Sequence, residues 1–322
     1  MRLSRFALAC AALLMAGAAS AQAPYPSRTL RMIVPLAAAS AVDNAARIVT
    51  QKMAENMGQQ IAIINQTGAA GLIGAREVAK AAPDGYTLGG FNDSIMTMIP
   101  NLQANMPWDI IRDFEPVSLV ATVEWGLVAA KNSGWSTAAD FIAAAKAAPG
   151  KINYASGGIG SPQHLAMALF AARTGISVTH VPYRGATQAA TDVAAGQVPV
   201  CFQGLATVAG LIQGDQLKLL GVTTKERLPE FPNAPTVSDS GLPGFLFESW
   251  FAVMVPAGTP KPIIDRLHAE IVKAAADPEV RDRLRVQGLT VRATSPDELR
   301  VALKDQLAKY AQVIKDAGIK AE

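Results

Sequence analysis

The sequence predicts an α/β protein of two lobes with a ligand cleft between them, and three observations lead to this prediction. Short apolar runs alternate with helical segments, first in one group and then in a second group further along the chain. The 322 residues suffice for two domains of about 150 residues each. No long linker separates the two groups, so crossover strands are expected to join the lobes.

The first group reads strand, helix, strand, helix, strand, which is typical of a parallel sheet. Apolar spacing from Val42 to Met57 indicates a helix that Gly58 ends, and the turn Pro83-Asp84-Gly85 stops the next one. We expect strands at 29–35, 61–64 and 86–90, and helices at 42–57 and 71–82.

The second group continues the alternation, and a mainly helical segment follows it. Expected strands lie at 117–123, 126–130, 152–155, 178–181, 199–202 and 217–222, with strand-like material at 241–255. Expected helices lie at 137–148, 161–174, 188–195, 207–213, 261–276, 278–287 and 295–317.

Composition excludes several classes of protein. With 50% hydrophobic and 17% charged residues and only two cysteines, the chain is neither disordered nor held together by disulfides. The formal charge of +3 comes from residues spread along the chain, without the basic cluster that nucleic-acid binding needs. Nucleic acid is therefore not an expected partner.

The N-terminus has the features of a secretory signal. Arg2 and Arg5 precede an apolar run from Phe6 to Ala19, and Ala19-Ser20-Ala21 supplies small residues for cleavage after Ala21. The run is too short for a membrane anchor, and Cys10 lies too near its front for lipid attachment. Residues 1–21 are thus expected to be a signal peptide. The mature chain keeps one cysteine, Cys201, which we expect to be buried.

Two loops are candidates for anion binding. The segment from Leu36 to Asp43 follows the first strand and precedes a helix, where backbone amides point outward. Ser40 and Asp43 could equally be simple helix caps. The segment from Tyr154 to His164 repeats this arrangement in the second group, with glycines that permit close approach and Ser161 as a helix cap.

Ser161 and His164 also suggest a hydrolase, because three residues apart on a helix they share a face. No Gly-x-Ser-x-Gly motif accompanies them, and His164, His180 and His268 lack the spacing of metal ligands. A structural or pocket-lining role for His164 and the absence of a metal site are the favoured interpretations. In the segment His180 to Gly185, Arg184 could pair with a carboxylate beside Tyr183, or it could be solvated surface.

The residues resemble a known family, the extracytoplasmic solute receptors of tripartite tricarboxylate transporters, also called Bug proteins. The similarity covers essentially the whole mature chain. It rests on six segments in order: YPSRTLRMIVP (25–35), AAPDGYTL (81–88), INYASGGIGSPQHLA (152–166), HVPYRG (180–185), NAPTVSDSGLPGF (233–245) and SWFAVMVPAGTP (249–260).

The resemblance implies a type II periplasmic binding protein, of the Venus flytrap kind, with a sheet in each lobe. Residues 22–123 and 246–322 would form one lobe and residues 124–245 the other. Such a protein is a periplasmic monomer without cofactor or catalytic residues. It closes on a small carboxylate, held by backbone amides and waters, and delivers it to a permease of two membrane subunits.

By position, the residues that would inherit ligand binding come from the two loops, the end of the third strand and the segment around Tyr183. They are Leu36, Ala39, Ser40, Ala41, Asp43, Asn92, Ser94, Ser156, Gly158, Ser161, His164, Tyr183, Arg184 and Gln203.

The sequence departs from the family pattern in two places. Alanines at 37–39 and 41 replace most of the usual prolines and glycines, which hardens that wall and limits positive φ. Gln203 stands where amino-acid-binding members often have an acid. An aromatic dicarboxylate such as terephthalate therefore fits at least as well as citrate. Two other functions stay open: a secreted hydrolase that uses Ser161 and His164, and a ligand-sensing receptor for a signalling kinase.

Overall fold

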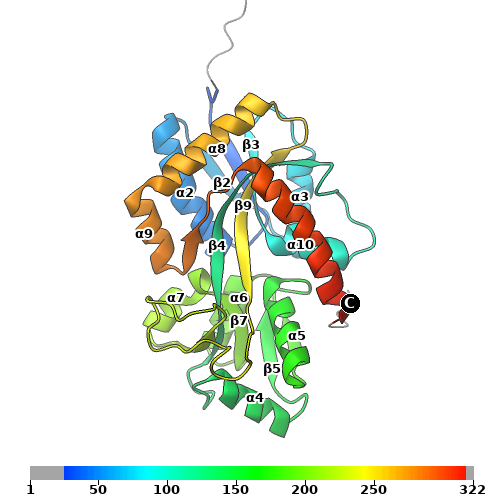
Figure 1. The fold of residues 1–322 in the computed structure, drawn as a ribbon, viewed down its shortest axis with the longest axis vertical. Coiled ribbons are helices and arrows are strands. Elements are labelled where there is room, and N and C mark those ends of the chain that lie inside the picture. The colour runs from blue at the N-terminus through cyan, green and yellow to red at the C-terminus, as the bar shows by residue number, and fades with distance from the viewer. Residues whose placement is uncertain (1–24, 317–322) are drawn as a thin grey trace, which may run out of the picture.

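The computed structural model describes residues 25–316. The expected signal peptide, its cleavage site and Cys10 lie outside the described residues. Figure 1 shows an elongated molecule divided into an upper and a lower half, each built on strands flanked by helices. The prediction of an α/β fold with two lobes is confirmed.

The upper half contains a parallel group of strands in the order β2-β1-β3, continued by antiparallel β9, β4 and β10. These strands are β1 (Leu30–Val34), β2 (Ile61–Asn65), β3 (Thr87–Asn92), β4 (Phe114–Ala130), β9 (Glu248–Pro256) and β10 (Leu289–Val291). The helices are α2 (Ala41–Met57), α3 (Leu72–Ala79), α8 (Lys261–Ala276), α9 (Pro278–Val286) and α10 (Pro296–Asp316).

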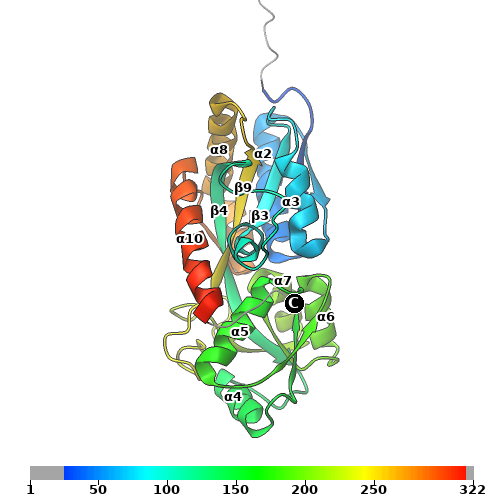
Figure 2. The same ribbon diagram turned by 90° about the vertical axis from the view of Figure 1, so that its right-hand side faces the viewer.

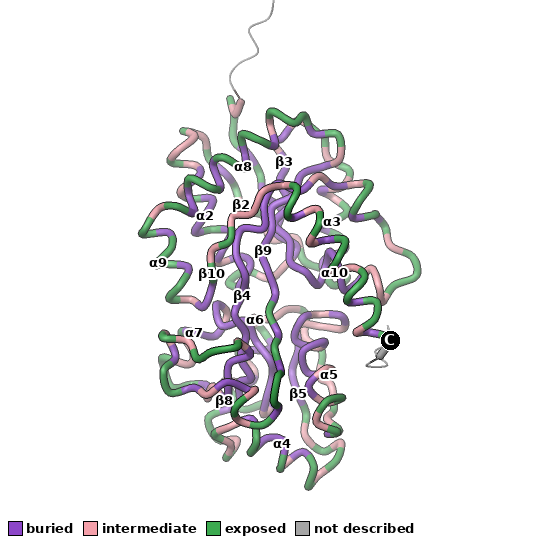
Figure 3. Tube along the Cα trace, in the orientation of Figure 1, coloured by how far each residue is buried: buried purple, intermediate pink, exposed green. Residues whose placement is uncertain are grey.

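Alternation along β9 shows how the upper sheet is covered. Phe251, Val253 and Val255 belong to the core under α2, α8 and α9, whereas Trp250, Ala252 and Met254 belong to the core under α3 and α10. Side chains of a strand point alternately to its two faces, so a strand buried on both faces is apolar throughout. Figure 3 shows β4 and β9 buried along most of their length.

The lower half has the strand order β8-β4-β7-β5-β6, with β5 parallel to β6 and β7. Its strands are β5 (Asn153–Ser156), β6 (Thr179–Pro182), β7 (Val200–Gly204) and β8 (Leu217–Val222). Its helices are α4 (Ala138–Ala147), α5 (Pro162–Thr174), α6 (Ala186–Ala194) and α7 (Leu205–Gln213). Buried Cys201 lies on β7, as expected.

Strand β4 belongs to both halves. Its first part, Phe114–Glu124, pairs with β9, and its second part, from Trp125 to Ala130, pairs with β7 and β8. The expectation of separate strands at 117–123 and 126–130 was wrong. Glu124 and Trp125, which interrupt the apolar pattern, are both buried and paired, so the strand runs through. Figures 1 and 2 show this strand passing from one half to the other.

A second crossing lies beside β4, where the chain returns from β8 to β9. Thr223 N donates to Trp125 O at 2.8 Å, and Phe247 N donates to Thr223 O at 3.2 Å. Trp125 Nε1 donates to Ser249 Oγ at 2.8 Å. These bonds tie the two crossing strands together at the junction of the halves. The boundaries expected for the lobes, near residues 123 and 246, fall close to this junction and stay a prediction.

Other elements differ from expectation in their extent. The segment 241–247 forms turns, so β9 begins only at Glu248, and α3 ends at Ala79 rather than at residue 82. Four short elements were not predicted: β10, a π-helical turn at Ser94–Met98 and 3₁₀ turns at Ala69–Gly71 and Ile99–Asn101. Below, the π-helical turn keeps its label η2 and the turn at Ile99–Asn101 its label η3.

Aromatic rings fill the core of the lower half. Phe170 lies 5.9 Å from Phe141, 5.5 Å from Phe202 and 5.6 Å from Phe245, measured between ring centroids. Phe245 belongs to the segment that leads back to the upper half. The cluster therefore fixes this segment against α5 and β7.

We expect Phe170→Ala to lower the free energy of unfolding by about 3–5 kcal/mol, because it leaves a cavity at the centre of this cluster. Urea denaturation measures the change. Phe170→Leu serves as control and should lose less than half as much. A loss below about 1 kcal/mol for Phe170→Ala would contradict the central position of this ring.

Candidate functional site

A cavity of about 690 Å³ lies between the two halves, and both contribute to its wall. From the upper half it is lined by Pro35–Ala37, Ser40–Val42, Thr67–Gly71, Asn92, Ser94, Ile95, Ile99, Leu102 and Gln103. From the lower half and the crossing strands it is lined by Trp125, Gly157–Gln163, Tyr183–Ala186, Gly204, Thr207 and Ser249. Its size suits a small organic molecule, since such sites span about 300–1,000 Å³.

Helix N-termini converge on this cavity. The N-cap residues Ser40, Gly71, Ser161, Gly185 and Gly204 all lie in its wall, and they begin α2, α3, α5, α6 and α7. Each N-terminus carries the positive end of a helix dipole. Among the described lining residues there is no Asp or Glu, and Arg184 is the one charged side chain. The wall is therefore electropositive and suited to an anion.

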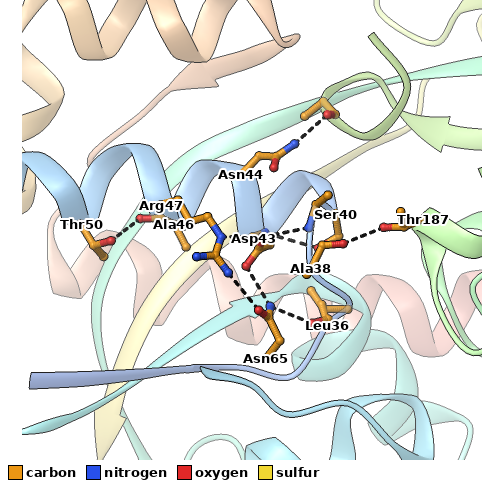
Figure 4. Close-up of polar contacts among 12 residues, drawn as sticks. Leu36, Ala38, Ser40, Asp43, Asn44, Ala46, Arg47, Thr50, Asn65 and Thr187 are labelled. Atoms are coloured by element: carbon orange, nitrogen blue, oxygen red, sulfur yellow. Dashed lines mark hydrogen bonds and ion pairs between the residues drawn. The ribbon is translucent and has the colours of Figure 1, made fainter. Parts of the chain in front are cut away.

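The first loop is held in place by Asp43, which lies behind the cavity wall (Figure 4). Its carboxylate accepts from Ala39 N at 2.9 Å, from Arg47 Nε at 2.9 Å and from Asn65 Nδ2 at 2.8 Å. Burial alone would raise the pKa of Asp43, but the hydrogen bonds from Arg47, Asn65 and Ala39 outweigh it and lower that pKa. Asn65 also donates to Leu36 O at 3.1 Å. Asp43 thus shapes the loop whose residues line the cavity.

Ala39 adopts φ of +59°, although the alanines of this loop were expected to limit positive φ. The hydrogen bond from its amide to Asp43 holds it in this left-handed conformation, which is strained for an alanine. Leu36, Ser40 and Ala41 line the cavity, whereas Ala39 is exposed and does not.

After β3, Asn92 and Ser94 are buried in the cavity wall. Asn92 Oδ1 accepts from Ile95 N at 3.1 Å and so begins the π-helical turn η2. Ser94 Oγ donates to Gly160 O in the other half at 2.7 Å. This contact joins the turn to the glycine loop of the lower half.

In the glycine loop, Gly158 and Ser161 line the cavity and Ser156 lies behind it. Ser161 Oγ accepts from His164 N at 3.3 Å, which makes Ser161 the N-cap of α5. Gly158 has φ of +117° and its amide donates to Ser156 Oγ at 3.0 Å. The backbone of this loop is therefore held in shape by local hydrogen bonds.

His164 supports this loop from behind rather than lining the cavity. Its Nδ1 accepts from Gly160 N at 3.1 Å, and its ring stacks on His180 with centroids 4.4 Å apart. Ser156 Oγ and His180 Nε2 are hydrogen bonded at 2.5 Å. Burial, and then the neighbouring His164 ring, lower the pKa of His180 to about 4. The ring of His164 thus holds a loop amide, which differs from the geometry of a base that activates the Ser161 hydroxyl.

Tyr183 and Arg184 line the cavity next to the glycine loop, and Arg184 is exposed. Burial raises the pKa of Tyr183 to about 12, so this phenol stays neutral near pH 7. Gln203 is fully buried behind the wall. Its Oε1 accepts from Gln163 Nε2 at 3.1 Å, and its Nε2 donates to Ala186 O at 3.0 Å. Gln203 therefore fixes the first residues of α5 and α6 relative to each other.

Further hydrogen bonds cross from α2 to the lower half. Thr187 Oγ1 donates to Ala38 O at 2.9 Å, as Figure 4 shows. Ala41 N donates to Thr207 Oγ1 at 3.0 Å, and Asn44 Nδ2 donates to Ala206 O at 2.9 Å. The structure therefore has the two halves in contact around the cavity.

Several lining residues were missed from the sequence. Thr67–Gly71 follow β2, and the rule that selected the loop after the first strand would also have selected them. Trp125 and Ser249 lie on the crossing strands, and only the tertiary structure brings them here. His180 and Gln163 support the site through hydrogen bonds to Ser156 and Gln203, which no local sequence pattern predicts.

Residues 25–316 contain neither a cluster of metal-ligand side chains nor a membrane-spanning helix. Within this range, no group of three His, Cys, Asp or Glu side chains is placed to hold a metal ion. Nor does any helix of the described range have both the length and the apolar character needed to cross a bilayer.

Comparison with known proteins places the chain in a family. Residues 45–319 match the model of the tripartite tricarboxylate transporter family receptor. BugT of Bordetella pertussis is 33% identical over 92% of this chain and 91% of its own. The solved structure of R. palustris Rpa4515 with adipate has a TM-score of 0.89 and 31% identity, over 92% of this chain and 99% of that chain.

Two further solved structures are similar throughout. The periplasmic binding protein BugD has a TM-score of 0.88 and 30% identity, over 92% of this chain and 100% of that chain. MatC from Rhodopseudomonas palustris with bound malate has a TM-score of 0.85 and 29% identity, over 90% of this chain and 100% of that chain. The chain therefore belongs to the tripartite tricarboxylate transporter receptor family and is a solute-binding protein of the Bug type.

Proposed function

We propose that the protein captures a small carboxylate in the cavity between its halves, without chemical turnover, and delivers it to a two-subunit membrane permease. The observation that carries the proposal is the convergence of helix N-termini on a cavity whose described lining holds no acid. A carboxylate gains hydrogen bonds from the amides and favourable interaction with the dipoles. We place the protein in the periplasm as a monomer, exported by a signal peptide cleaved after Ala21.

The comparisons support the class of ligand. Among similar solved structures, Rpa4515 carries adipate and MatC carries malate, both of which are dicarboxylates. The solute-binding relatives also favour binding over catalysis, in keeping with the position of the His164 ring. Ser40, Ala41, Gly158 and Ser161 would lie beside the carboxylates, and Val42 and Gln163, in the first turns of α2 and α5, would supply amides to them.

The apolar part of the wall points to the body of the solute. Ile95, Ile99 and Leu102 project from η2, η3 and the residue after them, and Leu36 and Trp125 also line the cavity. These side chains would leave the hydroxyl and third carboxyl of citrate without partners. An aromatic dicarboxylate such as terephthalate buries its ring there at no such cost. We therefore propose it as the preferred solute, with loops 36–43 and 156–161 at its carboxylates.

A binding screen tests the class of solute. We expect terephthalate to raise the melting temperature most, other phthalates and adipate less, and citrate least, because binding to the folded state stabilises it. Calorimetry should show a negative heat-capacity change for terephthalate and no product. Glutamine is the control and should have no effect. If no carboxylate raises the melting temperature, the proposed function is wrong, and if only aliphatic acids do, the aromatic solute is wrong.

Arg184 is expected to contribute modestly, because it is exposed and solvent screens its charge. Arg184→Gln should weaken terephthalate binding about three- to tenfold, and the loss should shrink in 1 M salt as screening grows. Titration calorimetry at two salt concentrations measures this. Exposed Arg281 on α9 is the control site, and Arg281→Gln should change nothing. Unchanged affinity in Arg184→Gln would place the guanidinium away from the solute.

Closure of the halves can be blocked at Gly185. A Cβ built there would lie 2.9 Å from Ala37 Cβ of the other half, whereas its φ of 174° is extended backbone that any residue adopts. Gly185→Ala should therefore weaken solute binding at least tenfold, about 1.4 kcal/mol, with little change in unfolding free energy.

Gly210→Ala is the matched control, since a Cβ there meets nothing within 4 Å. It should leave the affinity unchanged and stabilise α7 slightly. Equal affinities of wild type and Gly185→Ala would show that the solute binds without this contact.

A further inference from the structure

Asp93 lies in the wall between the solute cavity and a second groove. Its neighbour Ser94 lines the solute cavity, whereas Asp93 itself lines a groove of about 700 Å³ behind the crossing strands. That groove is formed by α10, β9, α5 and the segments that follow β8 and precede β9. The side chain of Asp93 is 1% exposed.

The contacts of Asp93 link it to the closed arrangement of the halves. It immediately precedes η2, where Thr97 Oγ1 donates to Asp93 O at 2.8 Å and Ser94 Oγ donates to Gly160 O at 2.7 Å. Tyr310 of α10 donates to Asp93 Oδ2 at a long 3.5 Å. The other oxygen, Oδ1, is buried and has no hydrogen-bond partner among the described residues. An ionised carboxylate would be poorly compensated in this position.

The charged groups around Asp93 do not compensate a negative charge on its buried carboxylate. Glu248 on β9 opposes ionisation, and Glu124 on β4 stands opposite Glu248 in the strand register. The groove is also lined by the cationic residues Arg173, Lys225, Arg227, Arg292 and Lys309, and no ion pair of the described residues joins one of them to Asp93. Burial, chiefly, raises the pKa of Asp93 to about 8. The amides of Ser94 and Asp93 and the Tyr310 hydroxyl act against this rise, and the charge of Glu248 adds to it. At pH 7 this side chain is therefore a neutral acid.

We propose that Asp93 is a positioning residue for solute binding. As a neutral acid it holds η2, and with it Ser94, in the arrangement that closes on Gly160, and its ionisation favours separation of the halves. No contact with the solute is involved. Ser94 lines the cavity, and Asp93 lies behind it. The protonation state of Asp93 therefore changes the affinity of the cavity for its solute.

The direction of the pH dependence follows from linkage. When the halves separate, Gly160 leaves Ser94 and water reaches η2, so ionisation becomes easier in the open form. The closed form then binds a proton that the open form releases. Closure is therefore most favourable at low pH, weakens as the pH rises toward 8, and levels off above it. His180 and Tyr183, with pKa values of about 4 and 12, do not titrate between pH 6 and 9.

The test measures adipate affinity by calorimetry, and the radius of gyration of the solute-free protein by small-angle X-ray scattering, at pH 6 and pH 8.5. In the wild type we expect adipate Kd to rise at least about fivefold and the solute-free protein to expand. Asp93→Asn keeps the shape of the neutral acid. It should bind at both pH values within about twofold of the wild type at pH 6, and it should not expand.

Glu124→Gln is the matched control in the same groove and should keep the wild-type pH dependence. A wild type without pH dependence, or an Asp93→Asn variant that retains it, would overturn the proposal. If Asp93→Asn does not fold, Tyr310→Phe replaces it: loss of the hydroxyl should extend the fall in affinity to higher pH, and an unchanged profile would again overturn the proposal. The adipate arm rests on the proposed function. If adipate does not bind at pH 6, terephthalate replaces it in this test. If neither binds, that function is contradicted and the scattering measurement alone decides the role of Asp93.

Discussion

The site depends on the junction where two strands cross between the halves. Strand β4 pairs with β9 above this junction and with β7 and β8 below it, and Thr223 bonds to both Trp125 and Phe247. Because one continuous strand serves both sheets, the ends of the parallel strands in the two halves face a common space. Every loop of the cavity follows from this constraint. Two separately folded sheets on a flexible linker would not bring these loops to a defined distance.

Facing strand ends explain why helix N-termini line the cavity. In each half, a parallel strand leads through a short loop into a helix, so the helix N-terminus lies at the sheet edge that faces the junction. Local side chains then hold each loop in shape: Asp43 for the first, and His164 with Ser156 for the glycine loop. The charged and titratable groups are thus used to hold the loops in shape, and the backbone of these loops lines the cavity.

Sequence patterns could predict the parts that depend on local chemistry. Ser40 and Ser161 as helix caps, Gly58 as a left-handed helix end and the loops after β1 and β5 all follow from residue types at fixed spacing. The continuity of β4 was missed because Glu124 breaks an apolar pattern, although pairing with β9 and burial decide its conformation. The stack of His164 on His180 and the bond from Ser94 to Gly160 join distant segments. Such contacts depend on the tertiary structure, which a single sequence does not display.

The wall of the cavity combines amides at helix N-termini with apolar side chains, and the two would contribute differently to specificity. Amides at helix N-termini can bind any carboxylate, because they recognise charge and oxygen geometry alone. Discrimination must therefore come from what separates the carboxylates, and here that region is built from Ile95, Ile99 and Leu102. These side chains belong to η2, η3 and the residue after them, and Asn101 of this segment donates to Leu307 O on α10. Under the proposed function, the segment that would select the solute is thus the same one that joins α10 to the glycine loop through Ser94. Selection and closure share one structural element, so a solute that fits the apolar wall also stabilises the contact that closes the halves.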